Sequence, residues 1–224
     1  IENPLTLVNF YIYALLLQTT DSICVIISRV ELIGGGAMDD ILELLYRRKA
    51  VMKGHFLLTS GLHSDTYIQC AQVCQYPEDN QLLAERIAKL FSDENIDLVV
   101  GPAVGGIIIA YETAKVLGAR NIFAERESGV LTFRRGFSIE RGEKVLVVED
   151  VITTAGTVKE LKDLVISYGG DVTGISSIVN RGNIRDIDGI PVRSLVYLPL
   201  STYSPEECPL CRNNIPVVKP GSRR

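Results

Sequence analysis

The stretch VLVVEDVITTAGT, residues 145–157, constrains the chain more than any other. It opens with four apolar residues, Val145–Val148, and three of them are β-branched, which is typical of a strand buried on both faces. Two acids follow, Glu149 and Asp150, and then a turn rich in threonine. From residue 158 to 168 apolar residues recur at helical spacing. The stretch therefore predicts a strand, an acid pair, a turn and a helix.

The turn at residues 153–157 has the composition of an anion site. A turn that opens a helix points unpaired N–H groups outward, and the helix dipole adds positive potential. Gly156 lets the backbone approach a ligand closely, and the threonines supply hydroxyl donors. The two upstream carboxylates can accept hydrogen bonds from the vicinal hydroxyls of a sugar. Together these features indicate a ribose 5-phosphate site; the alternative is an ordinary crossover whose threonines cap the helix.

This stretch resembles the motif that binds 5-phosphoribosyl 1-diphosphate (PRPP) in type I phosphoribosyltransferases. Its sequence is most similar to the motif in the orotate branch of that family. It matches neither the G-x-x-x-x-G-K-[ST] loop nor the G-x-G-x-x-G fingerprint. The resemblance implies a catalytic role for Asp150. It also implies that PRPP contacts Glu149, Asp150, Val151, Ile152, Thr153, Thr154, Ala155, Gly156 and Thr157.

A second segment, residues 54–68, carries an independent resemblance. Its residues match the pattern Gly-x-Phe-x-Leu-x-Ser-Gly-x-x-Ser in the N-terminal hood of orotate phosphoribosyltransferases. Thr59 stands where many family members have a lysine, so one cationic contact to the ligands is missing. His55 and His63 lie in the same segment; catalysis and a polar position on a surface loop remain open for both.

Two further loops have counterparts in the family. The glycine-rich turn at residues 101–106 is either a plain crossover turn or the family's pyrophosphate loop. Arg126 matches the arginine at the start of a mobile loop that closes over pyrophosphate, which implies a catalytic role for it. The lysines and the histidine that follow in the family are absent here. Arg134 and Arg135 are the candidates to replace them, and a solvated hairpin face is the alternative.

Arg181 ends the predicted strand at residues 171–182. Ligands bind at the carboxyl ends of strands in open α/β sheets, and a guanidinium can hold a carboxylate through two parallel hydrogen bonds. The resemblance implies that Arg181 and Thr153 contact orotate. A surface arginine without a ligand is the other interpretation.

The remaining patterns complete the expected secondary structure. Helices are expected over residues 39–52, 78–91 and from the glycine-rich turn to 117; strands over 66–70, 97–100, 121–126 and 191–198; and a hairpin arm over 131–135. In the second helix Leu82 is expected on the core face with Leu83, Ile87, Leu90 and Phe91.

Composition narrows the class of protein. With 224 residues, 46% hydrophobic and 22% charged, the chain suits one globular α/β domain. A net charge of −4 argues against a general nucleic-acid binder. Five cysteines, an odd number, fit the reducing cytoplasm. Cys70 and Cys74 together with Cys208 and Cys211 form a weak candidate zinc site, but no protein-held metal is predicted.

Residues 1–37 differ from the rest of the chain. Their two apolar runs are each shorter than the roughly 18–20 residues that span a bilayer, and no basic residues of a secretory signal precede them. The first methionine is Met38. We therefore expect residues 1–37 to be an extension outside the native fold and residues 38–224 to form the enzyme domain; a membrane anchor is the alternative.

The predicted fold is α/β: a twisted, mostly parallel sheet flanked by helices, as in type I phosphoribosyltransferases, with a small N-terminal hood at about residues 38–70. The resemblance implies transfer of the phosphoribosyl group from PRPP to orotate, with Mg²⁺ as cofactor, in a cytoplasmic homodimer without nucleic-acid or membrane partners. Two other functions remain open: a phosphoribosyltransferase for another base, and a non-catalytic PRPP-sensing regulator.

Overall fold

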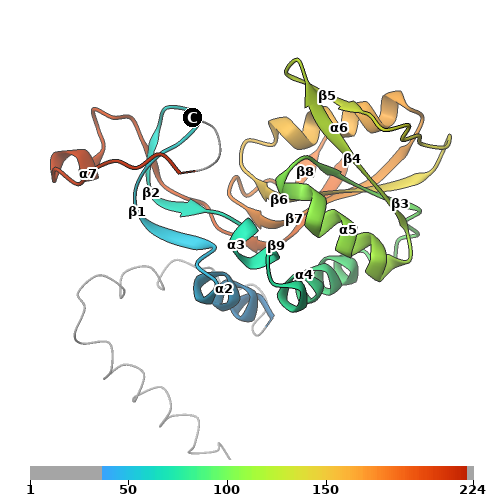
Figure 1. Ribbon diagram of the computed structural model, residues 1–224, viewed down its shortest axis with the longest axis horizontal. Coiled ribbons are helices and arrows are strands. Elements are labelled where there is room, and N and C mark those ends of the chain that lie inside the picture. Colours follow the sequence, from blue (N-terminus) through green and yellow to red (C-terminus); the bar gives the residue numbers. More distant parts are fainter. Residues whose placement is uncertain (1–36, 221–224) are drawn as a thin grey trace, which may run out of the picture. The chain divides into compact units, whose positions relative to one another are not determined.

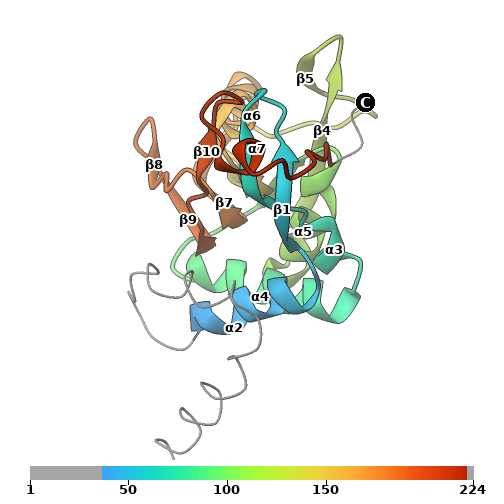
Figure 2. The ribbon, with the colours of Figure 1, turned by 90° about the vertical axis from the view of Figure 1, so that its left-hand side faces the viewer.

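The computed structural model describes residues 37–220 (Figures 1 and 2). The expectation for residues 1–37 therefore lies outside the described residues, Ala37 apart. The helices are α2 (Ala37–Arg47), α3 (Ala71–Cys74), α4 (Pro77–Leu90), α5 (Gly105–Leu117), α6 (Gly156–Ser167) and α7 (Pro209–Arg212). No helix within residues 37–220 has both the length and the apolar character needed to cross a membrane.

A seven-stranded sheet forms the frame of the domain, in the order β5-β4-β3-β6-β7-β9-β8. Its five inner strands are parallel, and the two edge strands are antiparallel to their neighbours. The strands are β3 (Leu98–Pro102), β4 (Arg120–Glu127), β5 (Val130–Phe133), β6 (Lys144–Ile152), β7 (Asp171–Asn180), β8 (Asp186–Ile187) and β9 (Ile190–Tyr197). The predicted mostly parallel sheet flanked by helices is confirmed.

The two faces of this sheet have separate cores because successive strand residues point to opposite sides. On β6, Leu146 and Val148 belong to the cluster that packs against α2, α4 and α5. Val145 and Val147 belong to the cluster that packs against α6. All four side chains are fully buried, as the run of apolar residues predicted, so β6 is held from both faces up to its carboxyl end.

A three-stranded antiparallel sheet, in the order β1-β2-β10, forms the hood on the left of Figure 1. Its strands are β1 (Val51–Leu57), β2 (His63–Ile68) and β10 (Thr202–Tyr203). The third strand comes from the C-terminal end of the chain, which the expected hood at residues 38–70 did not include. Ser64 strengthens the pairing of β2 with this end because its hydroxyl donates to the Ser201 carbonyl at 2.9 Å.

Two details of the sequence prediction were wrong. The first helix ends at Arg47 rather than near Met52, because Lys49 has a positive φ of 57° and turns the chain into β1. In α4, Leu82 is 38% exposed, while Leu83 and Ile87 are fully buried. The prediction for Leu82 was therefore wrong, whereas Leu83, Ile87 and Phe91 face the core as expected.

Gly174 on β7 is required by the packing of Phe91 at the end of α4. A Cβ at this position would overlap the Cε1 atom of Phe91, whose side chain is fully buried. Gly174→Ala should therefore lower the free energy of unfolding by about 1–3 kcal/mol, the usual cost of overpacking a core. Denaturant unfolding measures this loss. If the overlap is the cause, Gly174→Ala should cost less in a Phe91→Leu background; an equal cost in both backgrounds would contradict it.

Candidate active site

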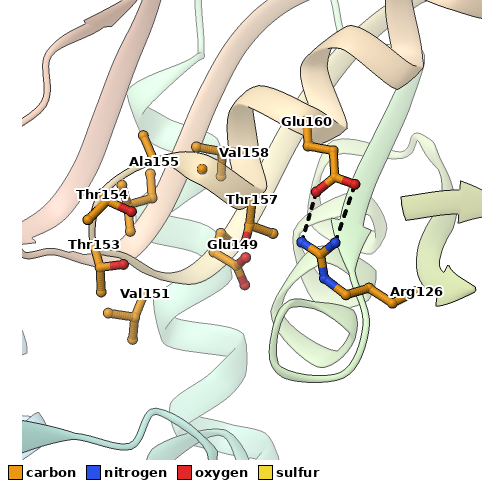
Figure 3. A pocket seen from close by; sticks show the side chains of 11 residues that line it. Arg126, Glu149, Val151, Thr153, Thr154, Ala155, Thr157, Val158 and Glu160 are labelled. Atoms are coloured by element: carbon orange, nitrogen blue, oxygen red, sulfur yellow. Dashed lines mark hydrogen bonds and ion pairs between the residues drawn. The ribbon is translucent and has the colours of Figure 1, made fainter. Parts of the chain in front are cut away.

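Two cavities meet at the turn between β6 and α6. The first has a volume of about 350 Å³ and is bounded by the turn, the first residues of α6, Glu149, Glu160 and Arg126 (Figure 3). The second, of about 910 Å³, lies between the hood and the carboxyl ends of the strands. Val151, Thr153 and Thr154 line both cavities. Every residue predicted for PRPP, for orotate or for catalysis lines at least one of them.

The turn leaves the N-terminus of α6 without a side-chain cap. Ala155 occupies the N-cap position with a left-handed backbone, φ 64°, and no side chain accepts a hydrogen bond there. The interpretation of this turn as a crossover capped by its threonines is therefore wrong. The first N–H groups of α6 face a cavity, and the helix dipole adds positive potential at the same place. This is the geometry of an anion site.

The acid pair near the end of β6 fits against the start of α5 because the first two residues of that helix, Gly105 and Gly106, have no Cβ. A Cβ at Gly105 would lie 2.6 Å from Oδ2 of Asp150, and a Cβ at Gly106 would lie 3.2 Å from Oε1 of Glu149. The glycine-rich turn lines neither cavity, so in this structure its glycines serve to make room for the two carboxylates. Asp150 in turn accepts the Val151 N–H on Oδ1 at 2.8 Å.

Glu149 and Asp150 differ in burial. Glu149 is 8% exposed, whereas Asp150 is half-exposed and faces the larger cavity. Burial, followed by the negative charge of Asp150, holds the pKa of Glu149 well above its ordinary value. Burial therefore favours the protonated form of Glu149.

Arg126 lies at the far end of the smaller cavity and is paired with Glu160 of α6 (Figure 3). Its Nη2 is 2.8 Å from Oε2 of Glu160, and its Nη1 donates to the Gly129 carbonyl at 2.6 Å. Glu160 also accepts the Leu131 N–H at 2.7 Å, which ties the β4–β5 hairpin to α6. The guanidinium predicted to act on the ligand is therefore held by a carboxylate of its own chain.

Arg181, unlike Arg126, forms no ion pair with a carboxylate of the described residues. Its backbone N–H donates to the Ile152 carbonyl at 2.8 Å, which places the residue beside the turn. Its Nε atom is buried and has no hydrogen-bond partner within residues 37–220. Burial lowers the pKa of this guanidinium, which lines the larger cavity near Tyr67 and Asp150. Arg181 therefore has a donor that no group among the described residues uses.

Lys219 was missed by the sequence analysis. It lies in the C-terminal segment and lines the larger cavity. Thr59, which stands where many family members have a lysine, lines the same cavity. The only sequence signal was a single cation after an apolar pair, Val217 and Val218, near the end of the chain. Such a signal does not show where the segment lies.

The arginines proposed to replace the missing loop cations are placed elsewhere. Arg135 forms a two-pronged ion pair with Glu125, both contacts at 2.9 Å, and Arg134 lies 3.8 Å from Glu127. Neither arginine lines either cavity, so the structure favours the solvated hairpin interpretation.

The histidines of the hood are also placed differently from what was expected. His55 and His63 are 3% and 7% exposed, lie in β1 and β2 and line neither cavity, so the interpretation of polar residues on a surface loop was wrong. Cys70 and Cys74 lie at α3 and belong to the core of the large sheet. They do not join Cys208 and Cys211, which gather instead with the two histidines.

Comparisons with known proteins agree with this geometry. Residues 72–193 match the phosphoribosyl transferase domain family. The orotate phosphoribosyltransferase of Caldanaerobacter subterraneus subsp. tengcongensis is 52% identical over 186 residues, which cover 83% of this chain and 98% of that protein. Among solved structures, the orotate phosphoribosyltransferase of Aeropyrum pernix has a TM-score of 0.61 at 22% identity and covers 70% of this chain and 93% of its own.

The fold is shared beyond one base specificity. The adenine phosphoribosyltransferase of Rhodothermus marinus has a TM-score of 0.59 at 23% identity and covers 71% of this chain and 99% of its own. The fold is therefore that of type I phosphoribosyltransferases, while the identity to named relatives distinguishes between its branches. By that identity the chain belongs to the orotate phosphoribosyltransferase family.

Proposed function

We propose that this chain transfers the phosphoribosyl group of PRPP to N1 of orotate, giving orotidine 5′-monophosphate and pyrophosphate for de novo pyrimidine synthesis. The observation that carries the choice of base is Arg181, whose buried Nε has no partner within the described residues. Because adenine phosphoribosyltransferases share this fold, the fold alone does not select a base. Orotate carries a carboxylate that adenine and uracil lack, and a planar guanidinium matches it in charge and geometry.

The smaller cavity suits the ribose 5-phosphate end of PRPP. The uncapped N–H groups of α6 would receive the phosphate, with the hydroxyls of Thr153, Thr154 and Thr157 beside them. Asp150 and Glu149, immediately before the turn, would accept hydrogen bonds from the ribose hydroxyls.

The same carboxylates fit a hydrated Mg²⁺ ion. Asp150 and Glu149 are hard oxygen donors at the wall of a cavity, which is the donor type that Mg²⁺ prefers, and the ion keeps several waters in such sites. When bound with PRPP, Mg²⁺ would neutralise negative charge on the leaving pyrophosphate. The raised pKa of Glu149 fits this role, because an incoming cation would favour the ionised carboxylate.

The residues of the chain would then act mainly by positioning. PRPP and orotate would be held so that N1 of the base faces C1 of the ribose, and the hood would exclude water from the larger cavity. Arg126 would stabilise the departing pyrophosphate only after leaving Glu160, its partner in the ligand-free chain. We also propose a cytoplasmic homodimer; the four free cysteines of the described chain are compatible with a reducing compartment.

The orotate assignment is tested at Arg181. Arg181→Ala should raise KM for orotate by roughly 30- to 5,000-fold, equivalent to about 2–5 kcal/mol for leaving the carboxylate unpaired, while KM for PRPP stays nearly unchanged. Arg181→Lys should recover only part of the loss, since a point charge cannot make the two-pronged contact. Steady-state kinetics with each substrate varied in turn measure both constants.

A matched control is available four residues further on. Arg185 stacks on the ring of Tyr197 and lines neither cavity, so Arg185→Ala should leave both constants unchanged. An unchanged orotate KM in Arg181→Ala, or an equal loss for PRPP, would place the carboxylate contact on another residue.

Asp150→Asn tests the diol contact. The substitution keeps the shape of the side chain but removes the charge, which should cost about 1.5–3 kcal/mol, or roughly 10- to 150-fold in kcat/KM for PRPP. The melting temperature should change little, because Asp150 is half-exposed. A variant with wild-type kcat/KM for PRPP would show that this carboxylate does not contact the sugar.

Glu149 should make the stability of the ligand-free chain fall with rising pH. Its folded pKa is raised, whereas an unfolded glutamate titrates near pH 4.3, so the unfolded chain releases this proton first as pH rises. The stabilisation is complete below the unfolded pKa and is lost as pH rises through the folded pKa. Glu149→Gln removes this loss and should gain stability relative to the wild type as pH rises above about 4. Denaturant unfolding across this range tests it; a difference between the two proteins that does not vary with pH would refute the assignment.

A further inference from the structure

Four potential metal ligands gather in the hood, outside both cavities. They are His55 on β1, His63 on β2, Cys208 at the N-cap of α7 and Cys211 inside α7, and their ligand atoms all lie within 4.8 Å of one another. The two histidines and Cys208 are buried, and Cys211 is half-buried. β10 pairs with β2, and Val218 pairs with Phe56 of β1, so the cluster lies where the C-terminal segment meets the strands of the hood. Nothing in the proposed reaction uses these side chains.

The distances within the cluster are close to those of a tetrahedral zinc site. Zn–S bonds of about 2.3 Å and Zn–N bonds of about 2.0–2.1 Å place a sulfur and a nitrogen about 3.5 Å apart. Here Nε2 of His55 lies 3.5 Å from Sγ of Cys208 and 3.7 Å from Sγ of Cys211, and Nδ1 of His63 lies 3.3 Å from Sγ of Cys211. The two ring nitrogens are 2.8 Å apart, so they would separate by about half an ångström around an ion.

The orientation of His55 is that of a metal ligand. Its Nδ1 lies 2.7 Å from the Ile215 carbonyl oxygen, which can only accept, so the proton of the neutral ring is on Nδ1. The lone pair of Nε2 therefore points into the cluster. A second hydrogen bond that fixes the ring and its tautomer is typical of metal-binding histidines.

The ligand set identifies the ion. Two thiols in Cys-x-x-Cys spacing and two imidazoles favour Zn²⁺, whereas Mg²⁺ and Ca²⁺ prefer oxygen ligands. Four protein ligands leave no position for water or substrate, which is the property of a structural site. Both thiols are free rather than joined in a disulfide.

The C-terminal segment needs such a link because it has no core of its own. Within residues 201–220 Cys208 is the only buried residue. Apart from the cluster, the last part of the segment is tied to β1 by Val218, whose N–H donates to the His55 carbonyl at 2.8 Å and whose carbonyl accepts the Leu57 N–H at 2.9 Å. Small segments without a hydrophobic core are commonly stabilised by a bound metal.

We propose that His55, His63, Cys208 and Cys211 bind one structural Zn²⁺ ion, which fastens the C-terminal segment to the hood and thereby holds Lys219 at the larger cavity. Lys219 directly follows Val218, the residue that pairs with β1. It supplies a cation to the cavity in which Thr59 stands at the family's lysine position. This consequence for Lys219 rests on the proposed function, whereas the metal site does not.

Metal content is the first test. The full chain, purified without chelator, should contain about one zinc per chain by elemental analysis. The Cys208→Ser/Cys211→Ser double variant should contain almost none, while Cys74→Ala, a free cysteine outside the cluster, should keep its zinc. Should the double variant fail to fold, cobalt exchanged into the wild type should show the absorption of a tetrahedral ion with thiolate ligands. Wild-type protein without zinc, or with a Cys208–Cys211 disulfide by mass spectrometry, would overturn the proposal.

The role of the ion is tested separately. Removal of zinc should speed proteolytic cleavage after residue 201. When Mg²⁺ is restored for the assay, the KM for PRPP or for orotate should be higher by roughly tenfold, the usual effect of losing one charged contact. Lys219→Ala should give a similar rise, and zinc removal should then add nothing further. If Lys219→Ala leaves KM unchanged in the zinc-loaded protein, the proposed role of Lys219 is refuted and the metal site still stands. If the protein shows no turnover with orotate at all, the proposed function is refuted instead.

Discussion

The close approach of two carboxylates to Gly105 and Gly106, the first residues of α5, determines the rest of the site. Glu149 and Asp150 lie near the carboxyl end of β6, and the start of α5 lies directly against them, with Gly105 and Gly106 at the points of contact. Any Cβ at Gly105 would displace Asp150 from the wall of the larger cavity. The acids can be held there because β6 is packed from both faces and hydrogen-bonded to β3 and β7. The packed sheet therefore fixes the positions of Glu149 and Asp150.

Two groups of opposite charge type in the site, Glu149 and Arg181, are buried in surroundings that disfavour their charged forms. Glu149 is a buried acid whose pKa is raised by burial and by the neighbouring charge of Asp150, and Arg181 is a partly buried cation whose Nε has no hydrogen-bond partner within residues 37–220. Each costs stability on its own, since buried polar groups without partners are unfavourable. A ligand that brings a cation to the first and a carboxylate to the second would relieve both. The charges that the proposed substrates and Mg²⁺ would bring are thus those that Arg181 and Glu149 lack.

The parts of this site that could be predicted are contiguous in sequence or follow a rule of the fold. The acid pair and the turn are neighbours along β6, and Arg181 was found because parallel strands bring their carboxyl ends to one edge. The capping role of the threonines could not be judged, because it depends on the left-handed backbone of Ala155. The pairing of Arg126 with Glu160 depends on how the β4–β5 hairpin lies against α6, and no spacing in the sequence encodes that.

The contacts within the hood could not be predicted from the sequence, because they join residues that are far apart in the chain. By spacing alone, Cys70 and Cys74 were as good partners for the C-terminal cysteines as any other residues, and only the pairing of β10 with β2 brings His55 and His63 to Cys208 instead. His55 and Cys208 are 153 residues apart. The same return of the chain places Lys219 on the cavity shared with Thr59. A cation lost from one segment of a binding site can thus be supplied by another that is distant in sequence, because the cavity depends on the position of the charge and not on its place in the chain.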